Sequence, residues 1–183
     1  EIGAGQGLLT ETWRRILHPL KTTFVDLLPM PQFGVSENDE YVVADAEEWL
    51  RNSSAKYDVI LSASTIQWFA DPVGFIRTVK GHLNPGGFAV ISTFSKGNLH
   101  ELDSIRPCPL IYHTAEEYKD VTGIEVEEWD RTLTFSSPRE MLMHLRHTGV
   151  SPRRSTSSKP LTALPTELTY RPLILIIGAS PIH

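Results

Sequence analysis

The sequence predicts an α/β fold built around an open, mostly parallel, doubly wound sheet. Apolar stretches of strand length alternate with amphipathic stretches of helix length along the chain. One of them, YDVILSA at 57–63, is apolar almost throughout, which is typical of a parallel strand buried on both faces. A glycine-rich turn at 3–7 precedes the first expected helix. In such sheets ligands bind at the carboxyl ends of the strands, and we expect the functional site there.

Length, composition and charge restrict the class of protein. The 183 residues are 40% hydrophobic and 21% charged, so we expect a single domain over 1–183 with one core. A net charge of −5 is unfavourable for binding nucleic acid phosphates. Cys108 is the only cysteine, which excludes an intrachain disulfide and favours a cytoplasmic location. The longest apolar run, at 173–177, is far shorter than the roughly 20 residues of a membrane span. We expect neither a nucleic acid nor a membrane as partner.

The first third of the chain contains two helices and two strands by its residue pattern. Leu8 to His18 has helical spacing, with Leu8, Leu9, Thr12 and Ile16 near one face. The elements that follow are a strand at 22–27, a strand at 41–44 and a short helix at 46–51. Pro29, Pro31 and Gly34 weaken any helix between those two strands.

Helix-start signals mark the rest of the chain. Asp71-Pro72 supplies an N-cap and a first-turn proline, and apolar residues then recur at helical spacing up to Leu83. The capping-box sequence SPRE at 137–140 begins a second helix, which ends at Gly149. The other expected elements are a strand at 57–63, a turn at 84–87, a strand at 88–94, an insertion at about 95–123 with a short helix at 115–120, a strand at 124–135, a loop at 151–158 and a last strand at 172–179.

The glycine set Gly3, Gly5 and Gly7 has GxGxG spacing at the start of a helix. Glycine permits positive φ and close approach of a ligand, and a helix N-terminus offers unpaired N–H groups. A tight strand-to-helix turn that binds no ligand is the alternative. The dinucleotide fingerprint GxGxxG requires its third glycine at the position of Leu8, so nicotinamide binding fits less well.

Two aspartates follow successive expected strands. Asp26 lies 19 residues after Gly7, where an acidic side chain can accept hydrogen bonds from ribose hydroxyls. Asp45 follows the next strand and can accept from an adenine amino group. Alone, Asp26 could be a solvated loop residue and Asp45 the N-cap of the helix at 46–51. Together with the glycine turn, both aspartates are expected to line one crevice.

These motifs, with NPGG at 84–87, resemble the class I S-adenosylmethionine-dependent methyltransferases over about residues 1–94. The resemblance implies a Rossmann-like, seven-stranded, mostly parallel sheet whose last strand, at 172–179, is antiparallel. It implies S-adenosylmethionine as cofactor and S-adenosylhomocysteine as product. The implied cofactor-binding residues are Glu1, Gly3, Gly5 and Gly7 for the methionine part, Asp26 with Leu27 for the ribose, and Asp45 with Ala46 for the adenine.

A narrower resemblance runs almost the whole length of the chain. The stretches STIQWF at 64–69, STF at 92–94, GNL at 97–99, SP at 137–138, HLR at 144–146 and LTYRPL at 168–173 are similar to the biotin-pathway malonyl-acyl-carrier-protein O-methyltransferases, the BioC family. This implies methylation of the free carboxylate of a malonyl thioester, with an acyl carrier protein as partner. The Gln67-Trp68 pair is also similar to the trans-aconitate methyltransferases. A catalytically silent member of the fold that acts as a binding protein is a further alternative.

The implied reaction needs no general base, because a malonyl carboxylate is already ionised at pH 7. Methyl transfer to it from a sulfonium removes two opposite charges, so an apolar crevice and in-line positioning suffice. We therefore expect no catalytic acid or base. Gln67, Trp68 and Tyr170 are the substrate-side candidates, although large aromatic residues are more often plain core. His144 and His147 lack a third ligand in the sequence, so no metal is expected.

Two further features concern the N-terminus and the partner. Glu1-Ile2 has the character of the end of a strand, so we expect a preceding segment in the natural chain, as in the BioC family, where it carries a tyrosine over the site. The stretch 139–159 holds five Lys or Arg and one acid, including Arg153 and Arg154. Such a patch can attract an acidic carrier protein, or it can be an ordinary solvated surface.

Overall fold

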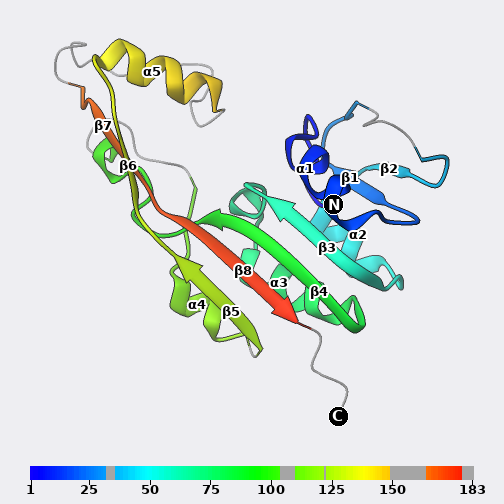
Figure 1. Cartoon of the computed structure of the whole chain (residues 1–183). Coiled ribbons are helices and arrows are strands. Elements are labelled where there is room, and N and C mark those ends of the chain that lie inside the picture. Colours follow the sequence, from blue (N-terminus) through cyan, green and yellow to red (C-terminus); the bar gives the residue numbers. More distant parts are fainter. Residues whose placement is uncertain (32–35, 104–109, 122, 149–163, 179–183) are drawn as a thin grey trace.

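The computed structural model describes the chain except for residues 32–35, 104–109, 122, 149–163 and 179–183 (Figure 1). Within the described residues it has eight strands, five α-helices and two short 3₁₀ helices. The predicted loop at 151–158 and the cationic residues at 153, 154 and 159 lie outside the described residues.

The main sheet is mixed and mostly parallel. Strands β1 (Thr23–Asp26) and β2 (Glu40–Val43) pair in parallel, as do β3 (Tyr57–Ala63) and β4 (Leu83–Phe94). Strand β8 (Pro172–Gly178) runs antiparallel to β4 and to β5 (Ile124–Glu128), which confirms the predicted antiparallel last strand. Ile2 forms parallel bridges to Val25 and to Ser62, and so connects β1 with β3. The spatial order is therefore β2, β1, Ile2, β3, β4, β8, β5.

The predicted count of seven strands is not confirmed. The eight described strands fall into three hydrogen-bonded groups. The group of β1 and β2 is separate from the group that contains β3 because only one residue, Ile2, lies between β1 and β3 in space and bridges them. In addition, the strand predicted at 124–135 is two strands, β5 and β6 (Arg131–Thr134). Strand β6 pairs antiparallel with β7 (Glu167–Tyr170), which was not predicted as a strand. The change of pairing occurs beside Asp130, whose carboxylate accepts from Arg171 Nε at 2.7 Å.

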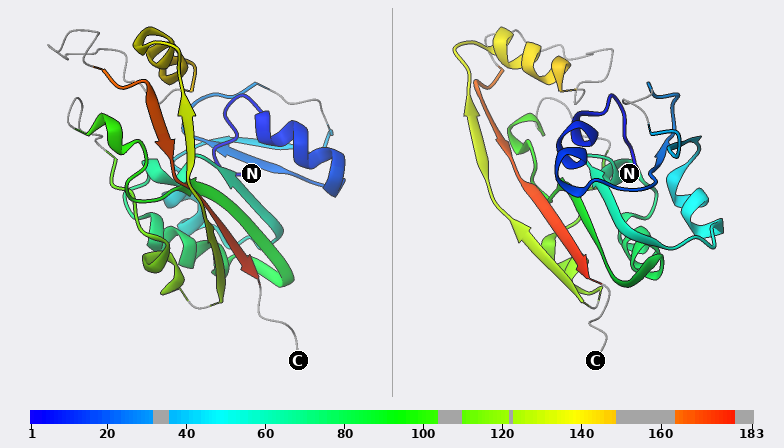
Figure 2. Two further views of the ribbon diagram at one scale, coloured as in Figure 1. Left: turned by 60° about the vertical axis from the view of Figure 1, so that its left-hand side comes forward. Right: turned by 45° about the vertical axis from the view of Figure 1, so that its right-hand side comes forward.

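The β6–β7 ribbon continues past the carboxyl ends of β3 and β4 and carries α5 (Pro138–His147) at its far end (Figures 1 and 2). Leu168 of β7 packs with Met141 and Leu145 of α5 in a small separate core. Tyr170 lies in the same cluster. Helix α5 is therefore fixed outside the main sheet, beyond the edge where the site was expected.

All five predicted helices are confirmed. They are α1 (Leu8–Leu17), α2 (Ala46–Asn52), α3 (Pro72–Gly81) and α4 (Ala115–Lys119), besides α5. The Asp71 side chain accepts from the Gly74 N–H at 2.8 Å, as the N-cap prediction required. Strand β4 begins at Leu83, so the turn predicted at 84–87 lies inside it, at an irregularity in its register with β3. The described part of the connection between β1 and β2 contains no helix.

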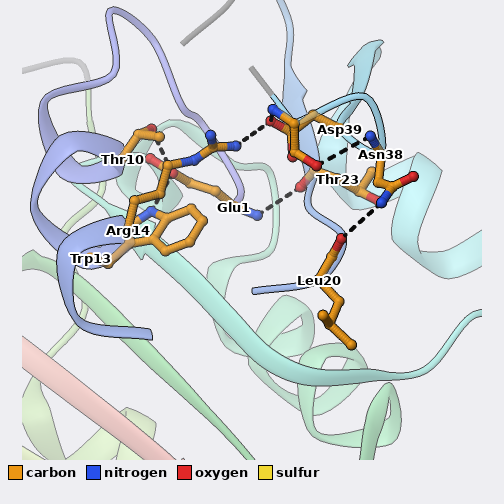
Figure 3. Close-up of polar contacts among 9 residues, drawn as sticks. Glu1, Thr10, Trp13, Arg14, Leu20, Thr23, Asn38 and Asp39 are labelled. Atoms are coloured by element: carbon orange, nitrogen blue, oxygen red, sulfur yellow. Dashed lines mark hydrogen bonds and ion pairs between the residues drawn. The ribbon is translucent and has the colours of Figure 1, made fainter. Parts of the chain in front are cut away.

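The two faces of the sheet have different cores. Ile60 and Val25 point into the large cluster formed with α2, α3 and α4. Leu61 and Phe24 point to the opposite face, where Trp13 of α1 packs on them. The predicted inner face of α1 is wrong, since Leu8 is 84% and Ile16 is 70% exposed, whereas Thr10 and Trp13 are buried. Two kinds of contact fix this face: Trp13 packs on Phe24, and both Thr10 and Trp13 bond to the carboxylate of Glu1 (Figure 3).

Candidate functional site

A cavity of about 420 Å³ lies at the carboxyl ends of β1 and β3, and its size is in the range of small-molecule sites. Four segments enclose it: the glycine turn, the end of β1, the start of α2, and the end of β3 with the 3₁₀ helix η1 (Ile66–Trp68). Six of the predicted site residues line it, namely Gly3, Asp26, Leu27, Asp45, Ala46 and Trp68. The sequence spacing therefore located one common crevice.

The glycine turn needs glycine for two different reasons. Gly3, Gly5 and Gly7 all have positive φ, at 68°, 53° and 83°. At Gly3 a Cβ atom would also lie 2.0 Å from Thr65 Oγ1, so the turn packs tightly on the end of β3. At Gly5 the nearest atom to such a Cβ is the Gly3 carbonyl oxygen, 4.0 Å away, so this part of the backbone is bare. A ligand can approach the main chain at Gly5 without displacing a side chain.

Asp26 links the end of β1 to the glycine turn. Its Oδ2 accepts from the Gly5 N–H at 2.9 Å and its Oδ1 accepts from the Leu28 N–H at 3.0 Å. A carboxylate has about four lone-pair positions, so each oxygen can still accept another donor. The side chain is thus held in place by backbone while it faces the cavity.

Asp45 has the structural role that the sequence left open and also lines the cavity. Its Oδ1 accepts from the Glu48 N–H at 3.0 Å, which makes it the N-cap of α2. The next residue, Ala46, is buried and is small enough to leave space beside the cap.

Glu47 is a cavity residue that sequence reasoning missed. Its carboxylate accepts from the backbone N–H groups of Ala70 and Asp71, at 2.8 and 2.9 Å, and so ties α2 to the loop before α3. A single Glu in a helix rich in Glu carries no distinguishing signal. Ser64, also on the lining, has the positive φ of 51° that is uncommon for a residue other than glycine.

The remaining predicted residues do not line the cavity. Gln67 bridges the ends of β3 and β4, because its Nε2 donates to the Ser64 carbonyl at 2.7 Å and its Oε1 accepts from Thr93 Oγ1 at 3.2 Å. Tyr170 packs in the α5 cluster, with its hydroxyl 2.9 Å from His144 Nε2, and burial raises the pKa of Tyr170. Glu1, Gly5 and Gly7 are close in sequence to Gly3 but do not line the cavity themselves. The Glu1 carboxylate points toward α1. Of the three substrate-side candidates, only Trp68 lines the cavity.

The charge of the lining is one-sided. Its described residues include Asp26, Asp45 and Glu47 and contain neither Lys nor Arg. Such a lining stabilises a positively charged ligand more than a negative one. No group of three His, Cys, Asp or Glu side chains that could hold a metal occurs among the described residues. In the same part of the chain, no helix is both long and apolar enough to cross a bilayer.

Residues 1–147 match the family model described as a methyltransferase domain. The chain belongs to this methyltransferase family. It is similar to the malonyl-[acyl-carrier protein] O-methyltransferase of Porphyromonas gingivalis, at 36% identity over 82% of this chain and 61% of that protein. It is also similar to the enzyme of the same name from Chlorobium phaeovibrioides, at 31% identity over 97% of this chain and 78% of that one. The chain thus spans less than two thirds of the length of the first of these relatives.

Two solved structures share the fold. A putative methyltransferase from Bacillus halodurans superposes with a TM-score of 0.62 at 11% identity, over 99% of this chain and 91% of that one. The N-methyltransferase NodS from Bradyrhizobium japonicum, in complex with S-adenosyl-L-homocysteine, superposes with a TM-score of 0.54 at 13% identity, over 97% and 74%. At these identities the likeness shows a Rossmann-like methyltransferase fold.

Proposed function

We propose that the protein is an S-adenosylmethionine-dependent O-methyltransferase that converts the free carboxylate of a malonyl thioester, carried on an acyl carrier protein, to its methyl ester. The observation that carries the proposal is that the glycine turn, Asp26 and Asp45 line the same cavity. The names and identities of the curated relatives support the substrate. We also infer that Ile2 belongs to a strand between β1 and β3, which brings the number of strands in the main sheet to seven. We further infer that the enzyme acts in the cytoplasm.

The residues present fit the proposed donor. Bare backbone at Gly5 allows close contact, and the Asp26 carboxylate has acceptor capacity left for ribose hydroxyls. Asp45 and Ala46, across the cavity, are proposed to meet the adenine. The acidic lining suits the positive charge of a sulfonium. When bound, S-adenosylmethionine supplies the activated methyl group.

The chain's own contribution to the reaction is orientation. A malonyl carboxylate is ionised at neutral pH, so no side chain has to remove a proton from it. Trp68, at the cavity and 61% exposed, is proposed to border the incoming acyl group. Gln67 holds the ends of β3 and β4 together, and we propose that it keeps this wall in place. Fixed geometry can lower a barrier substantially without acid–base chemistry.

The proposed protein partner fits the exposed surface of α5. Arg139 and Arg146 are exposed on this helix, beyond the carboxyl edge of the sheet. A cationic surface there attracts an acidic carrier domain toward the site.

The test is mass spectrometry of malonyl-acyl carrier protein after incubation with the protein and S-adenosylmethionine. We expect the malonyl-carrier protein to gain the mass of one methyl group. Acetyl-acyl carrier protein, which lacks the free carboxylate, should show no gain. Asp26→Ala is the loss-of-function control. Methylation of trans-aconitate but not of the malonyl carrier would contradict the proposed substrate. Binding of the donor with no methylation of either would instead support a silent member of the fold.

A further inference from the structure

One wall of the cavity is the short segment at 68–71 that leads from η1 into α3. Trp68 and Phe69, at its start, both line the cavity. Their own N–H groups bond only locally, to the carbonyls of Thr65 and Ile66 at 3.0 and 3.1 Å. Because Trp68 is 61% exposed, the place of its ring depends on the backbone that carries it more than on packing around it.

Glu47 of α2 holds the end of this segment with both oxygens of its carboxylate. Oε2 accepts from the Ala70 N–H at 2.8 Å, and Oε1 accepts from the Asp71 N–H at 2.9 Å. Hydrogen bonds from backbone N–H groups to a carboxylate are among the stronger ones. Two of them on adjacent N–H groups fix the direction of the backbone as well as its distance from α2.

Other contacts join the same segment to α3. The Phe69 ring meets the Phe75 ring edge-on, with centroids 4.7 Å apart, and the Asp71 side chain accepts from the Gly74 N–H. Glu47, in contrast, joins the segment to α2, which also borders the cavity. The spacing between these two walls of the cavity therefore depends on Glu47.

Glu47 directly follows the two residues that are proposed to meet the adenine, Asp45 and Ala46. Asp45 is fixed by its own bond from the Glu48 N–H, at 3.0 Å. This cap shares no side-chain atom with the bonds of Glu47, so removal of the Glu47 carboxylate leaves it in place. The donor side and the acyl side of the cavity can thus be perturbed separately.

We propose that Glu47 is a positioning residue for the acyl side of the reaction: it holds the segment at 68–71 against α2 and so keeps Trp68 beside the incoming acyl group. This inference rests on the proposed function. Methyl transfer requires the carboxylate and the methyl group in line, so a wall that shifts lowers the rate even when the donor is bound. The same bonds would be merely structural if they served only to attach α3 to α2.

The first experiment removes the bonds in steps. Glu47→Gln keeps one acceptor oxygen for the two N–H groups, and Glu47→Ala keeps none. We expect kcat/KM for malonyl-acyl carrier protein to fall about tenfold and about 100-fold, in proportion to the charge-assisted hydrogen bonds lost. The Kd of S-adenosylhomocysteine, measured by calorimetry, should change less than twofold. Glu48→Ala is the matched control, because Glu48 carries the same charge on the same helix, is exposed and does not line this cavity.

A double-variant cycle shows whether Glu47 acts through Trp68. In the Trp68→Ala background the ring to be positioned is absent, so Glu47→Ala should lower kcat/KM less than about threefold further. A full 100-fold loss in that background would overturn the positioning role. Equal weakening of turnover and of S-adenosylhomocysteine binding by Glu47→Ala would overturn it as well.

Hydrogen exchange of the Ala70 and Asp71 amides, followed by NMR, tests the contact without substrate. Exchange should become more than about tenfold faster in Glu47→Ala and stay unchanged in Glu48→Ala, and unchanged exchange in both would contradict the proposal. If Glu47→Ala does not fold, as judged by its thermal transition, Glu47→Gln decides the question. If the unaltered protein binds S-adenosylhomocysteine but methylates no malonyl carrier, the proposed function alone fails, and the exchange rates decide whether Glu47 holds this wall.

Discussion

Replacing Gly3 by alanine is expected to be strongly destabilising, for reasons that the local geometry makes quantitative. The added Cβ would lie 2.0 Å from Thr65 Oγ1, 2.4 Å from its Cγ2 and 2.7 Å from its Cβ. Contacts to the rigid Cβ of Thr65 cannot be relieved by rotation. Rotation about χ1 would also break the bond from Thr65 Oγ1 to the Ala63 carbonyl, which is 3.0 Å long.

Two costs add at this position. A non-glycine residue at a φ of 68° costs about 1–2 kcal/mol. Overpacking against Thr65 costs about 1–3 kcal/mol more. We therefore expect Gly3→Ala to lower the free energy of unfolding by roughly 2–5 kcal/mol, and to weaken S-adenosylhomocysteine binding because Gly3 lines the cavity.

Urea denaturation of four proteins measures both costs: the unaltered chain, Gly3→Ala, Thr65→Gly and the double variant. In the Thr65→Gly background the steric part is absent, so Gly3→Ala should cost only the 1–2 kcal/mol of the backbone. Gly81→Ala is the control, since a Cβ at Gly81 meets no atom within 4 Å. Equal costs of Gly3→Ala in the two backgrounds would refute the argument from Thr65.

Three further outcomes are expected. Asp26→Ala should weaken S-adenosylhomocysteine about 100-fold by calorimetry, through the loss of two charge-assisted hydrogen bonds, and an unchanged Kd would contradict the ribose role. Reversing Arg139 and Arg146 to Glu should raise the KM for malonyl-carrier protein but not for malonyl-CoA, and equal effects would exclude docking on α5. Hydrogen bonds from the Ser136 hydroxyl and N–H lower the pKa of Glu140, so Ser136→Ala should raise that pKa in an NMR titration.

The elements that the sequence predicted best carry their signals locally. The Asp71-Pro72 N-cap and the apolar run at 57–63 need no information from elsewhere in the chain, and both are confirmed in place. The crevice was also predictable, because positions at the ends of parallel strands converge whatever the details of packing. Asp26 and Asp45 line the same cavity for this reason.

The features that the sequence did not predict depend on distant partners. β7 was missed because its pairing with β6 joins residues more than 30 positions apart, and the break between β5 and β6 lies at Asp130, whose carboxylate bonds to the distant Arg171. The buried face of α1 was misassigned because it depends on residues outside the helix: Thr10 and Trp13 bond to the Glu1 carboxylate, and Trp13 also packs on Phe24. Polar partners of this kind leave no periodic signal.

A carboxylate of the cavity can stabilise the fold through backbone hydrogen bonds and still accept a hydrogen bond from a ligand. Asp26, Asp45 and Glu47 each accept hydrogen bonds from backbone N–H groups, and all three line the cavity. Those bonds use only part of the acceptor capacity of a carboxylate, and they fix its direction before a ligand arrives. The N-cap role of Asp45 is therefore an argument for a binding role. An acceptor already held by the fold loses little conformational freedom when a ligand's donor meets it.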